Sequence, residues 1–377
     1  MHFQLDDEVQ AFRKAVRAHL EETLTAELEE RLYRSGVAHD DDFARGLVAR
    51  DLLAPDRRPL EWQLLQDELM YADAPVYLSE TTRMVAGVID KTGSPELKQR
   101  IIPKAMAAEL TIALGFTEPE CGSDVAAART RAVRSGDEWI INGSKMFTTN
   151  GHIADYVFLL ARTNPEKPKH KGLTMFLVPL DSPGVEAQAV WTLSGERTNI
   201  TFYSDVRVSD VYRIGEVDGG WAVLGLALQD EHSSGWGPHL ARLLDHAEHW
   251  ARDTTDPSGT ARICDTDVRR RLSRIAIELE VATLLQRRCV WMTEQGQTPV
   301  AEGPMSKLFS TEALVRAAQD VNEMVGPDAL RSRLEPTAVE QGRFEYLMRF
   351  SLGTTIYAGT SEVQRNIIAQ RGLGLPR

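Results

Sequence analysis

The chain has 377 residues, of which 42% are hydrophobic, and its formal net charge at pH 7 is −12. This length can bury more than one core, so we expect two or three structural units. An acidic chain repels phosphodiester backbones, which argues against nucleic acid as a partner.

The first residues are charged, and no run reaches the roughly 18 apolar residues that a membrane-spanning helix needs. None of the three cysteines is spaced as a zinc or redox pair. These features are typical of a reducing compartment, so we expect a cytoplasmic protein with no membrane partner.

Residues 1–112 are predicted to form an N-terminal helical domain. Val9, Phe12, Val16 and Leu20 recur at the spacing of one helix face, and residues 60–72 and 96–110 repeat this pattern. Gly and Pro mark the breaks between these segments.

The pattern changes to short strands over residues 113–217. An Asn-Gly pair at 142–143 lies between β-rich runs, as in a hairpin. Helical spacing returns over residues 218–377. The order all-α, all-β, all-α argues against a doubly wound nucleotide fold, which alternates strands and helices.

Two segments carry groups suited to ligand binding. In GFTEPECGSD (115–124), Thr117, Gly122 and Ser123 supply hydroxyls and backbone N–H groups in a sharp turn. In INGSKMFTTNG (141–151), Phe147 offers a flat face and Thr149 a hydroxyl, both suited to a flavin ring. Each segment has an ordinary alternative: a surface turn for the first, a core Phe and a strand Thr for the second.

Several motifs together resemble the acyl-CoA dehydrogenase family in order and spacing over nearly the whole chain. They are TEPECGSD (117–124), KMFTTN (145–150), DYVFLLAR (155–162), FYSDVRV (202–208), IGEVDGGW (214–221) and IYAGTSEVQRNIIAQRGLGLPR (356–377). The resemblance implies an α+β fold with an N-terminal helical domain, a central small β-barrel or sandwich domain, and a C-terminal four-helix-bundle domain.

The family resemblance also implies chemistry. FAD would bind between the β-domain and the C-terminal domain and remove two hydrogens from an acyl-CoA thioester, giving a 2,3-enoyl-CoA. A carboxylate takes the α-proton, the β-hydrogen leaves as hydride to flavin N5, and an electron-transfer flavoprotein accepts the electrons. The implied cofactor contacts are Phe116, Thr117, Phe147, Thr148, Thr149, Gly359, Thr360 and Glu362, and Ser123 matches a contact to the CoA ligand.

The chain departs from the family pattern at the base. Many members have Glu where this chain has Ala358, whose backbone N–H can still donate to the thioester carbonyl. Glu231 matches the position of an alternative base on a helix, with Asp230 as a second candidate and His232 where Arg is frequent. The resemblance therefore assigns catalysis to Glu231 and Ala358, and substrate contact to Asp230 and His232. The alternative is that Glu231 is an ordinary helix carboxylate.

A second departure concerns the FAD pyrophosphate. In members of the family, an Arg-x-x-Phe-Gly motif from a neighbouring subunit binds the pyrophosphate. Residues 251–265 of this chain lack that motif. Residues 322–330 replace a Gln-rich, Gly-Gly-containing turn that also helps. These losses predict a homologous partner subunit in an α2β2 tetramer. The alternative is a homo-oligomer in which Arg252 or Arg262 reaches the phosphates.

Other readings remain open at this stage. Relatives with the same fold include flavin monooxygenases and oxidases, and a third reading is a non-catalytic subunit of a heteromeric complex. The sequence does not identify the acyl group. Analogy with paired-subunit members of the family suggests steroid side-chain thioesters. We expect no metal site at His239, His246 and His249, and a solvated loop at Lys167, Lys169 and Lys171.

Overall fold

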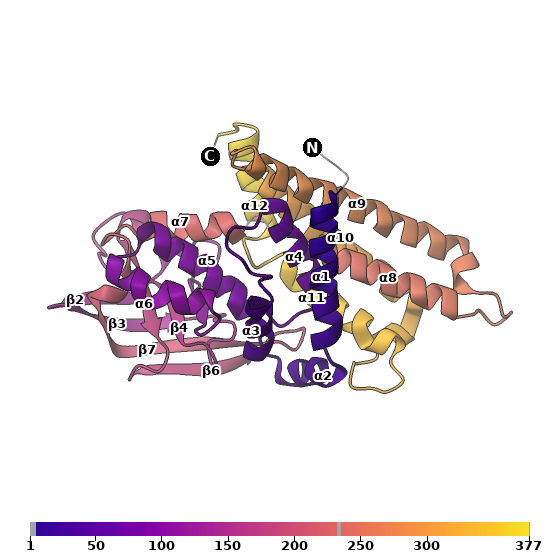
Figure 1. Cartoon of the computed structure of the whole chain (residues 1–377), viewed down its shortest axis with the longest axis horizontal. Coiled ribbons are helices and arrows are strands. Elements are labelled where there is room, and N and C mark those ends of the chain that lie inside the picture. The colour runs from indigo at the N-terminus through magenta and orange to yellow at the C-terminus, as the bar shows by residue number, and fades with distance from the viewer. Residues whose placement is uncertain (1–4, 232–234, 377) are drawn as a thin grey trace. The chain divides into compact units, whose positions relative to one another are not determined.

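The computed structural model describes residues 5–231 and 235–376, except for the side chains of residues 229–231. Figure 1 shows the elements in chain order. The contacts divide the chain into two compact units. We call residues 1–20, 56–73 and 231–377 the helical unit, and residues 21–55 and 74–230 the sheet unit.

The sheet unit contains one eight-stranded sheet with the order β6-β7-β3-β2-β4-β5-β8, and β1 pairs in parallel with β4. Its strands are β1 (Ile112–Gly115), β2 (Arg131–Ser135), β3 (Glu138–Lys145), β4 (Tyr156–Arg162), β5 (Leu173–Pro179), β6 (Val185–Trp191), β7 (Arg197–Ser209) and β8 (Arg213–Ile214). Its helices are α2 (Ala26–Ser35), α3 (Asp41–Ala49), α5 (Tyr77–Thr92), α6 (Pro95–Met106) and α7 (Gly220–Glu231).

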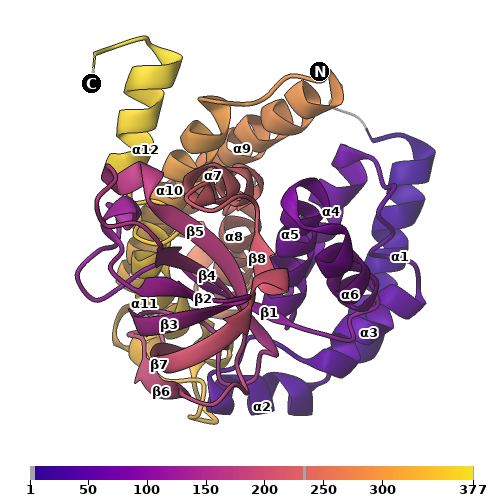
Figure 2. The same cartoon turned by 90° about the vertical axis from the view of Figure 1, so that its left-hand side faces the viewer.

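Almost every side chain of strands β4 and β5 is buried. Because successive side chains point to opposite sides of a strand, both faces of these two strands are covered. Phe158 and Met175 pack with side chains of α5, α6 and α7, and Figure 2 shows α5 and α6 beside the strands. Val157 and Phe176 belong to a second core with Trp139 and residues of β7. The sheet therefore has one face against helices and encloses its own core on the other.

The helical unit combines segments that are far apart in sequence. It contains most of α1 (Asp7–Thr23), with α4 (Pro59–Tyr71), α8 (Gly237–Asp253), α9 (Thr266–Glu294), α10 (Glu302–Val325), α11 (Arg343–Thr354) and α12 (Ser361–Ile367). Arg13 and Arg17 of α1 both bind the buried Glu68 of α4, at 2.5 and 2.7 Å. Helices α8 to α11 share one apolar core that includes Leu243, Ile275 and Leu314.

The predicted fold class is confirmed: helices precede a central β-sheet region, and further helices follow it. Strands extend from Ile112 to Ile214, and helices resume at Gly220. Among the described residues, no helix is long and apolar enough to cross a membrane.

Candidate active site

The turn after β1 presents the first group of predicted site residues. Glu118 and Cys121 exchange two backbone hydrogen bonds, of 3.0 and 3.1 Å. This closed turn leaves Ser123 exposed, while Phe116 and Thr117 are half-buried. The sequence prediction of a sharp turn at this point is confirmed.

The segment after β3 presents the second group. Phe147 has a φ of +62° and its side chain is 54% exposed. A left-handed backbone is unusual for a bulky residue, and such strain is often found at binding sites. Thr149 is half-buried, and its hydroxyl lies 3.3 Å from that of Thr198. An exposed aromatic face beside a hydroxyl suits a flat ligand with polar edges. The isoalloxazine ring is such a ligand.

Thr148 differs from its neighbours because its side chain is fully buried. Its hydroxyl lies 3.1 Å from that of Thr201, and its carbonyl accepts a 3.0 Å hydrogen bond from Asn199 Nδ2. These bonds fix the segment to β7. A cofactor contact from Thr148 stays a prediction.

The two segments of the sheet unit are joined directly. The Met146 N–H donates to the Thr117 carbonyl at 2.8 Å. The buried Lys145 donates to the Phe116 carbonyl at 3.2 Å and to Glu118 at 2.7 Å. The structure thus brings Thr117 and the segment that carries Phe147 together.

The C-terminal turn belongs to the helical unit. Ala358 and Gly359 have φ values of +54° and +80°. Within the described part of the chain, no hydrogen bond uses the Ala358 N–H as a donor. The Thr360 hydroxyl accepts a 3.3 Å bond from the Val363 N–H and so caps α12. The free N–H of Ala358 can donate to a ligand oxygen.

Glu362 lies in the first turn of α12 and is exposed. Its own backbone N–H and the Thr360 hydroxyl lower its pKa. It is therefore ionised at neutral pH.

The base segment falls at the edge of the described residues. Helix α7 ends at Glu231, but the side chains of Asp230 and Glu231 lie outside what the structure describes, and so does His232. Their assigned roles stay predictions.

The region that lacks the pyrophosphate motif forms a small turn, in which Asp256 accepts hydrogen bonds from Ser258 and Thr260. The Arg252 side chain is 3.5 Å from Glu248 and well exposed. The Arg262 guanidinium lies 5.9 Å from the Trp250 ring centroid. Both arginines remain candidates for the homo-oligomer alternative.

Two of the three histidines share one carboxylate partner, and the third is buried apart from them. His246 and His249 each place Nδ1 against one oxygen of Glu340, at 2.8 and 2.6 Å. Burial lowers the pKa of His239 to about 4. In the described residues, no group of three or more His, Cys, Asp or Glu side chains is arranged to hold a metal ion.

Two lysines of the lysine-rich loop form ion pairs with carboxylates elsewhere in the sheet unit. Lys167 binds Asp218 at 2.8 Å, and Lys169 binds Asp124 at 2.7 Å. Both pairs are partly exposed to solvent, as expected for a solvated loop.

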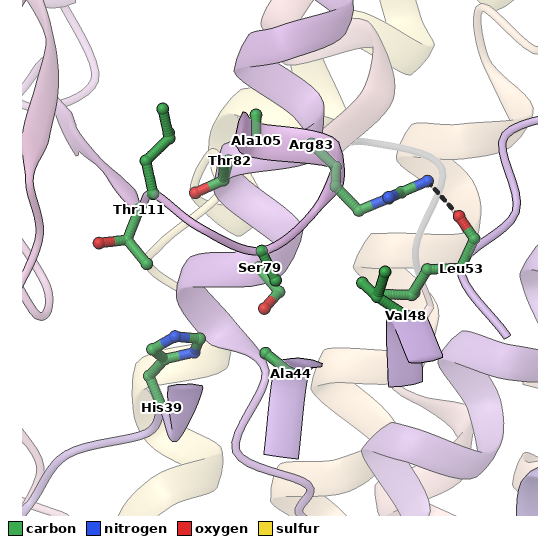
Figure 3. Close-up of a pocket in the computed structure, with 11 residues that line it drawn as sticks. His39, Ala44, Val48, Leu53, Ser79, Thr82, Arg83, Ala105 and Thr111 are labelled. Carbon is green, nitrogen blue, oxygen red and sulfur yellow. Dashed lines mark hydrogen bonds between the residues drawn. The ribbon is translucent and has the colours of Figure 1, made fainter. Parts of the chain in front are cut away.

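A small pocket elsewhere in the sheet unit contains none of the predicted site residues. Figure 3 shows His39, Ser79 and Thr82 beside it, with Arg83 donating to the Leu53 carbonyl at 2.6 Å. It lies among α3, α5, the end of α6 and the residues just before β1, and it shares no lining residue with the turn that carries Thr117.

Sequence reasoning missed the buried residues that hold the candidate site. Lys145, Glu118 and Lys307 are all buried, and each binds a segment that carries predicted site residues. Two of them stand inside the motifs TEPECGSD and KMFTTN. The local sequence does not predict that these side chains are buried, because a lysine or glutamate beside a turn is normally solvated.

Comparison with known proteins confirms the protein family that the order of helical and β regions indicates. Residues 113–211 match the family "Acyl-CoA dehydrogenase, middle domain", and residues 218–373 match "Acyl-CoA dehydrogenase, C-terminal domain". Acyl-CoA dehydrogenase FadE26 of Mycobacterium tuberculosis is 36% identical over 332 residues, covering 85% of this chain and 82% of that protein. FadE29 of the same organism is 33% identical over 324 residues, covering 85% of this chain and 82% of the relative.

Two solved structures are similar to this chain over its full length. The ChsE4-ChsE5 complex from Mycobacterium tuberculosis has a chain with a TM-score of 0.92 and 32% identity, covering 100% of both chains. The Tcur3481-Tcur3483 steroid ACAD has a chain with a TM-score of 0.92 and 30% identity, again covering 100% of both. The fold and sequence together define an oxidoreductase of the acyl-CoA dehydrogenase type. The chain belongs to the acyl-CoA dehydrogenase family.

Proposed function

We propose that the protein catalyses FAD-dependent α,β-dehydrogenation of an acyl-CoA thioester to a 2,3-enoyl-CoA. The observation that carries this proposal is the exposed, left-handed Phe147 beside the half-buried hydroxyls of Thr117 and Thr149. Large apolar side chains with strained backbones are unusual on free surfaces and frequent in ligand sites. FAD, when bound, supplies the acceptor for the β-hydride.

The residues of the sheet unit would hold the isoalloxazine. Phe147 packs against the ring, and the hydroxyls of Thr117 and Thr149 meet its polar edge. Gly359, Thr360 and Glu362 are the proposed contacts from the C-terminal turn, and Ser123 is the proposed contact for CoA. The side chain of Ser123 is exposed and has no hydrogen-bond partner among the described residues, which supports a role toward a ligand.

Proton removal is assigned to Glu231. A thioester α-carbon is a weak acid, so the negative charge that develops on its carbonyl oxygen must be stabilised as the proton leaves. The free Ala358 N–H is the proposed donor to that oxygen. A carboxylate in a dry site has a raised pKa and is a stronger base near neutral pH.

The assembly is proposed to be heteromeric. Residues 251–265 lack an arginine motif for the FAD pyrophosphate, and two similar solved structures are named as pairs of chains. A homologous partner that carries this arginine would complete the cofactor site. An electron-transfer flavoprotein is the proposed electron acceptor.

The acyl group is proposed to be bulky, with steroid side-chain thioesters as the first class to test. The support is the similarity to a structure named a steroid ACAD. Straight-chain and branched thioesters are the comparison substrates.

The test is to isolate the FAD-containing complex and add acyl-CoA without oxygen. Loss of the oxidised flavin absorbance together with formation of enoyl-CoA supports the dehydrogenase. A flavin that is reduced by thioester and reoxidised by O2 within seconds would favour a same-fold oxidase or monooxygenase. A complex that keeps full activity when Glu231 is changed to Gln would assign catalysis to the partner chain.

A further inference from the structure

A buried ion pair lies beneath the proposed cofactor site. Lys145 Nζ is 2.7 Å from Glu118 Oε1, and the two side chains are 0% and 7% exposed. Removing two charges from water is costly, and this cost is offset only when further hydrogen bonds satisfy both groups. The function proposed above does not use either residue.

The pair is well satisfied by backbone groups. Glu118 accepts N–H bonds from Arg129 at 2.7 Å and Thr130 at 2.9 Å, and Lys145 also donates to the Phe116 carbonyl at 3.2 Å. Burial alone would raise the pKa of Glu118, but Lys145 and the two backbone donors hold it below its ordinary value. Glu118 is therefore ionised at neutral pH, and its charge opposes the lowering of the Lys145 pKa that burial causes.

The two charges lie on the two segments that carry the predicted contacts. Glu118 follows Thr117 directly, and Lys145 precedes Met146 and Phe147. The 2.8 Å bond from the Met146 N–H to the Thr117 carbonyl joins the same segments. A change in the ion pair would therefore move Thr117 relative to Phe147 and Thr149.

We propose that Lys145 and Glu118 are positioning residues that fix the spacing between Thr117 and the Phe147–Thr149 segment, so that both fit a flat heteroaromatic ligand. This inference rests on the proposed function, in which that ligand is the isoalloxazine of FAD. Stability alone is a weak explanation for this placement, because apolar residues of similar volume often stabilise a core as well as or better than a buried ion pair.

The experiment uses the full chain in the complex in which it is isolated, with FAD removed and then titrated back. Three variants are compared with wild type: Glu118→Gln, Lys145→Met and the double variant Lys145→Met/Glu118→Gln. Glu118→Gln keeps the shape and part of the hydrogen bonding. The double variant leaves no unpaired charge and protects against a failure of Lys145→Met to fold.

The matched control is Asp320→Asn in the helical unit. Asp320 is also a buried carboxylate, and it binds Arg271 at 2.9 Å and Arg274 as well. It is not a proposed cofactor contact. The measurements are the FAD dissociation constant, the visible spectrum of the bound flavin and the thermal unfolding midpoint of the apoprotein.

We expect Glu118→Gln and the double variant to raise the FAD dissociation constant at least ~10-fold, as loss of a bond to a charged group does. The flavin absorption bands should shift. Asp320→Asn should lower the unfolding midpoint but leave FAD affinity within about twofold, because distant sites act independently.

Folded variants with wild-type FAD affinity and an unchanged flavin spectrum would overturn the inference. It would also be overturned if all three variants failed to fold while Asp320→Asn folded, since the pair would then serve stability alone. A wild-type complex that binds no FAD would instead refute the proposed function.

Discussion

Lys307 of α10 donates a hydrogen bond from Nζ to the carbonyl oxygen of Gly359 at 2.8 Å. Gln364 adds a 2.9 Å bond from Nε2 to the Ala358 carbonyl. Both carbonyls of the C-terminal turn are therefore held from within the helical unit, which leaves the Ala358 N–H available. A buried lysine thus fixes the donor proposed to stabilise the thioester oxyanion.

Lys307→Met tests this arrangement. The Gly359 carbonyl loses its bond from the lysine amine and keeps only the 3.3 Å bond from Gln364 Nε2. Loss of a bond to a charged group should cost about 1.5–3 kcal/mol of unfolding free energy. Movement of the Ala358 N–H should also lower turnover at least ~10-fold, because small displacements in a reactive site are costly. Chemical denaturation and steady-state turnover measure the two effects.

Arg316→Met is the control for Lys307→Met. Arg316 is exposed on the same helix and binds Glu278 at 2.9 Å. Exposed pairs contribute about 0–1 kcal/mol, so stability and turnover should change little. Equal loss of turnover in both variants would contradict a specific role for Lys307.

Thr149 and Ser123 should act on different ligands. Thr149→Ala should weaken FAD binding and shift the flavin spectrum, whereas Ser123→Ala should raise the dissociation constant for acyl-CoA. Each lost hydrogen bond should cost about 0.5–1.5 kcal/mol. Titrations of FAD and of acyl-CoA with both variants measure this division, and identical effects on both ligands would refute it.

His239 should make stability depend on pH. It is buried against Phe350, with ring centroids 5.2 Å apart, and burial lowers its pKa from 6.5 to about 4. The unfolded chain therefore binds more protons as pH falls below 6.5. Stability contributed by the neutral ring is complete above the unfolded pKa and is lost as pH falls toward the folded pKa.

The size of this effect follows from the shift. Between pH 6.5 and pH 5, one such group contributes a loss of about 1.6 kcal/mol. His239→Gln, which does not titrate, should flatten the dependence over this range in denaturant unfolding. An unchanged pH slope in that variant would assign the dependence to other groups.

The fold class was predictable from the sequence because it depends on local patterns, whereas the site assignment stays a prediction. The apolar runs of β4 and β5 and the order of TEPECGSD and KMFTTN are visible along the sequence. The grouping of α1 and α4 with the C-terminal helices was not predicted. It depends on long-range contacts such as the 2.6 Å hydrogen bond from the Tyr71 hydroxyl of α4 to Asp245 of α8, which no local pattern encodes.

The same limit applied inside the site. The positive φ of Phe147 and the burial of Lys145 are consequences of tertiary packing. Phe147 was selected from the sequence for its flat face and for the resemblance of KMFTTN to the family motif. Lys145 was not selected, because charged residues are almost never fully buried unless they are paired.

The partner subunit is tested by stoichiometry. Expressed alone, the chain should bind much less than one FAD per polypeptide, since an arginine bond to a diphosphate contributes about 1.5–3 kcal/mol. Co-expression with a homologous subunit that carries this arginine should give about one FAD per heterodimer. A stable homo-oligomer with one FAD per chain and full turnover, by light scattering and absorbance, would end this proposal.

The most direct measurement of the central proposal is anaerobic flavin reduction in the complex that contains Glu231→Gln. A steroid side-chain CoA thioester is mixed with wild type and with the variant, and flavin absorbance is followed with time. Glutamine keeps the shape of glutamate but cannot take a proton, so reduction should slow at least ~10³-fold. The spectral change that accompanies thioester binding should persist. A variant that reduces its flavin at more than about a tenth of the wild-type rate would contradict Glu231 as the base.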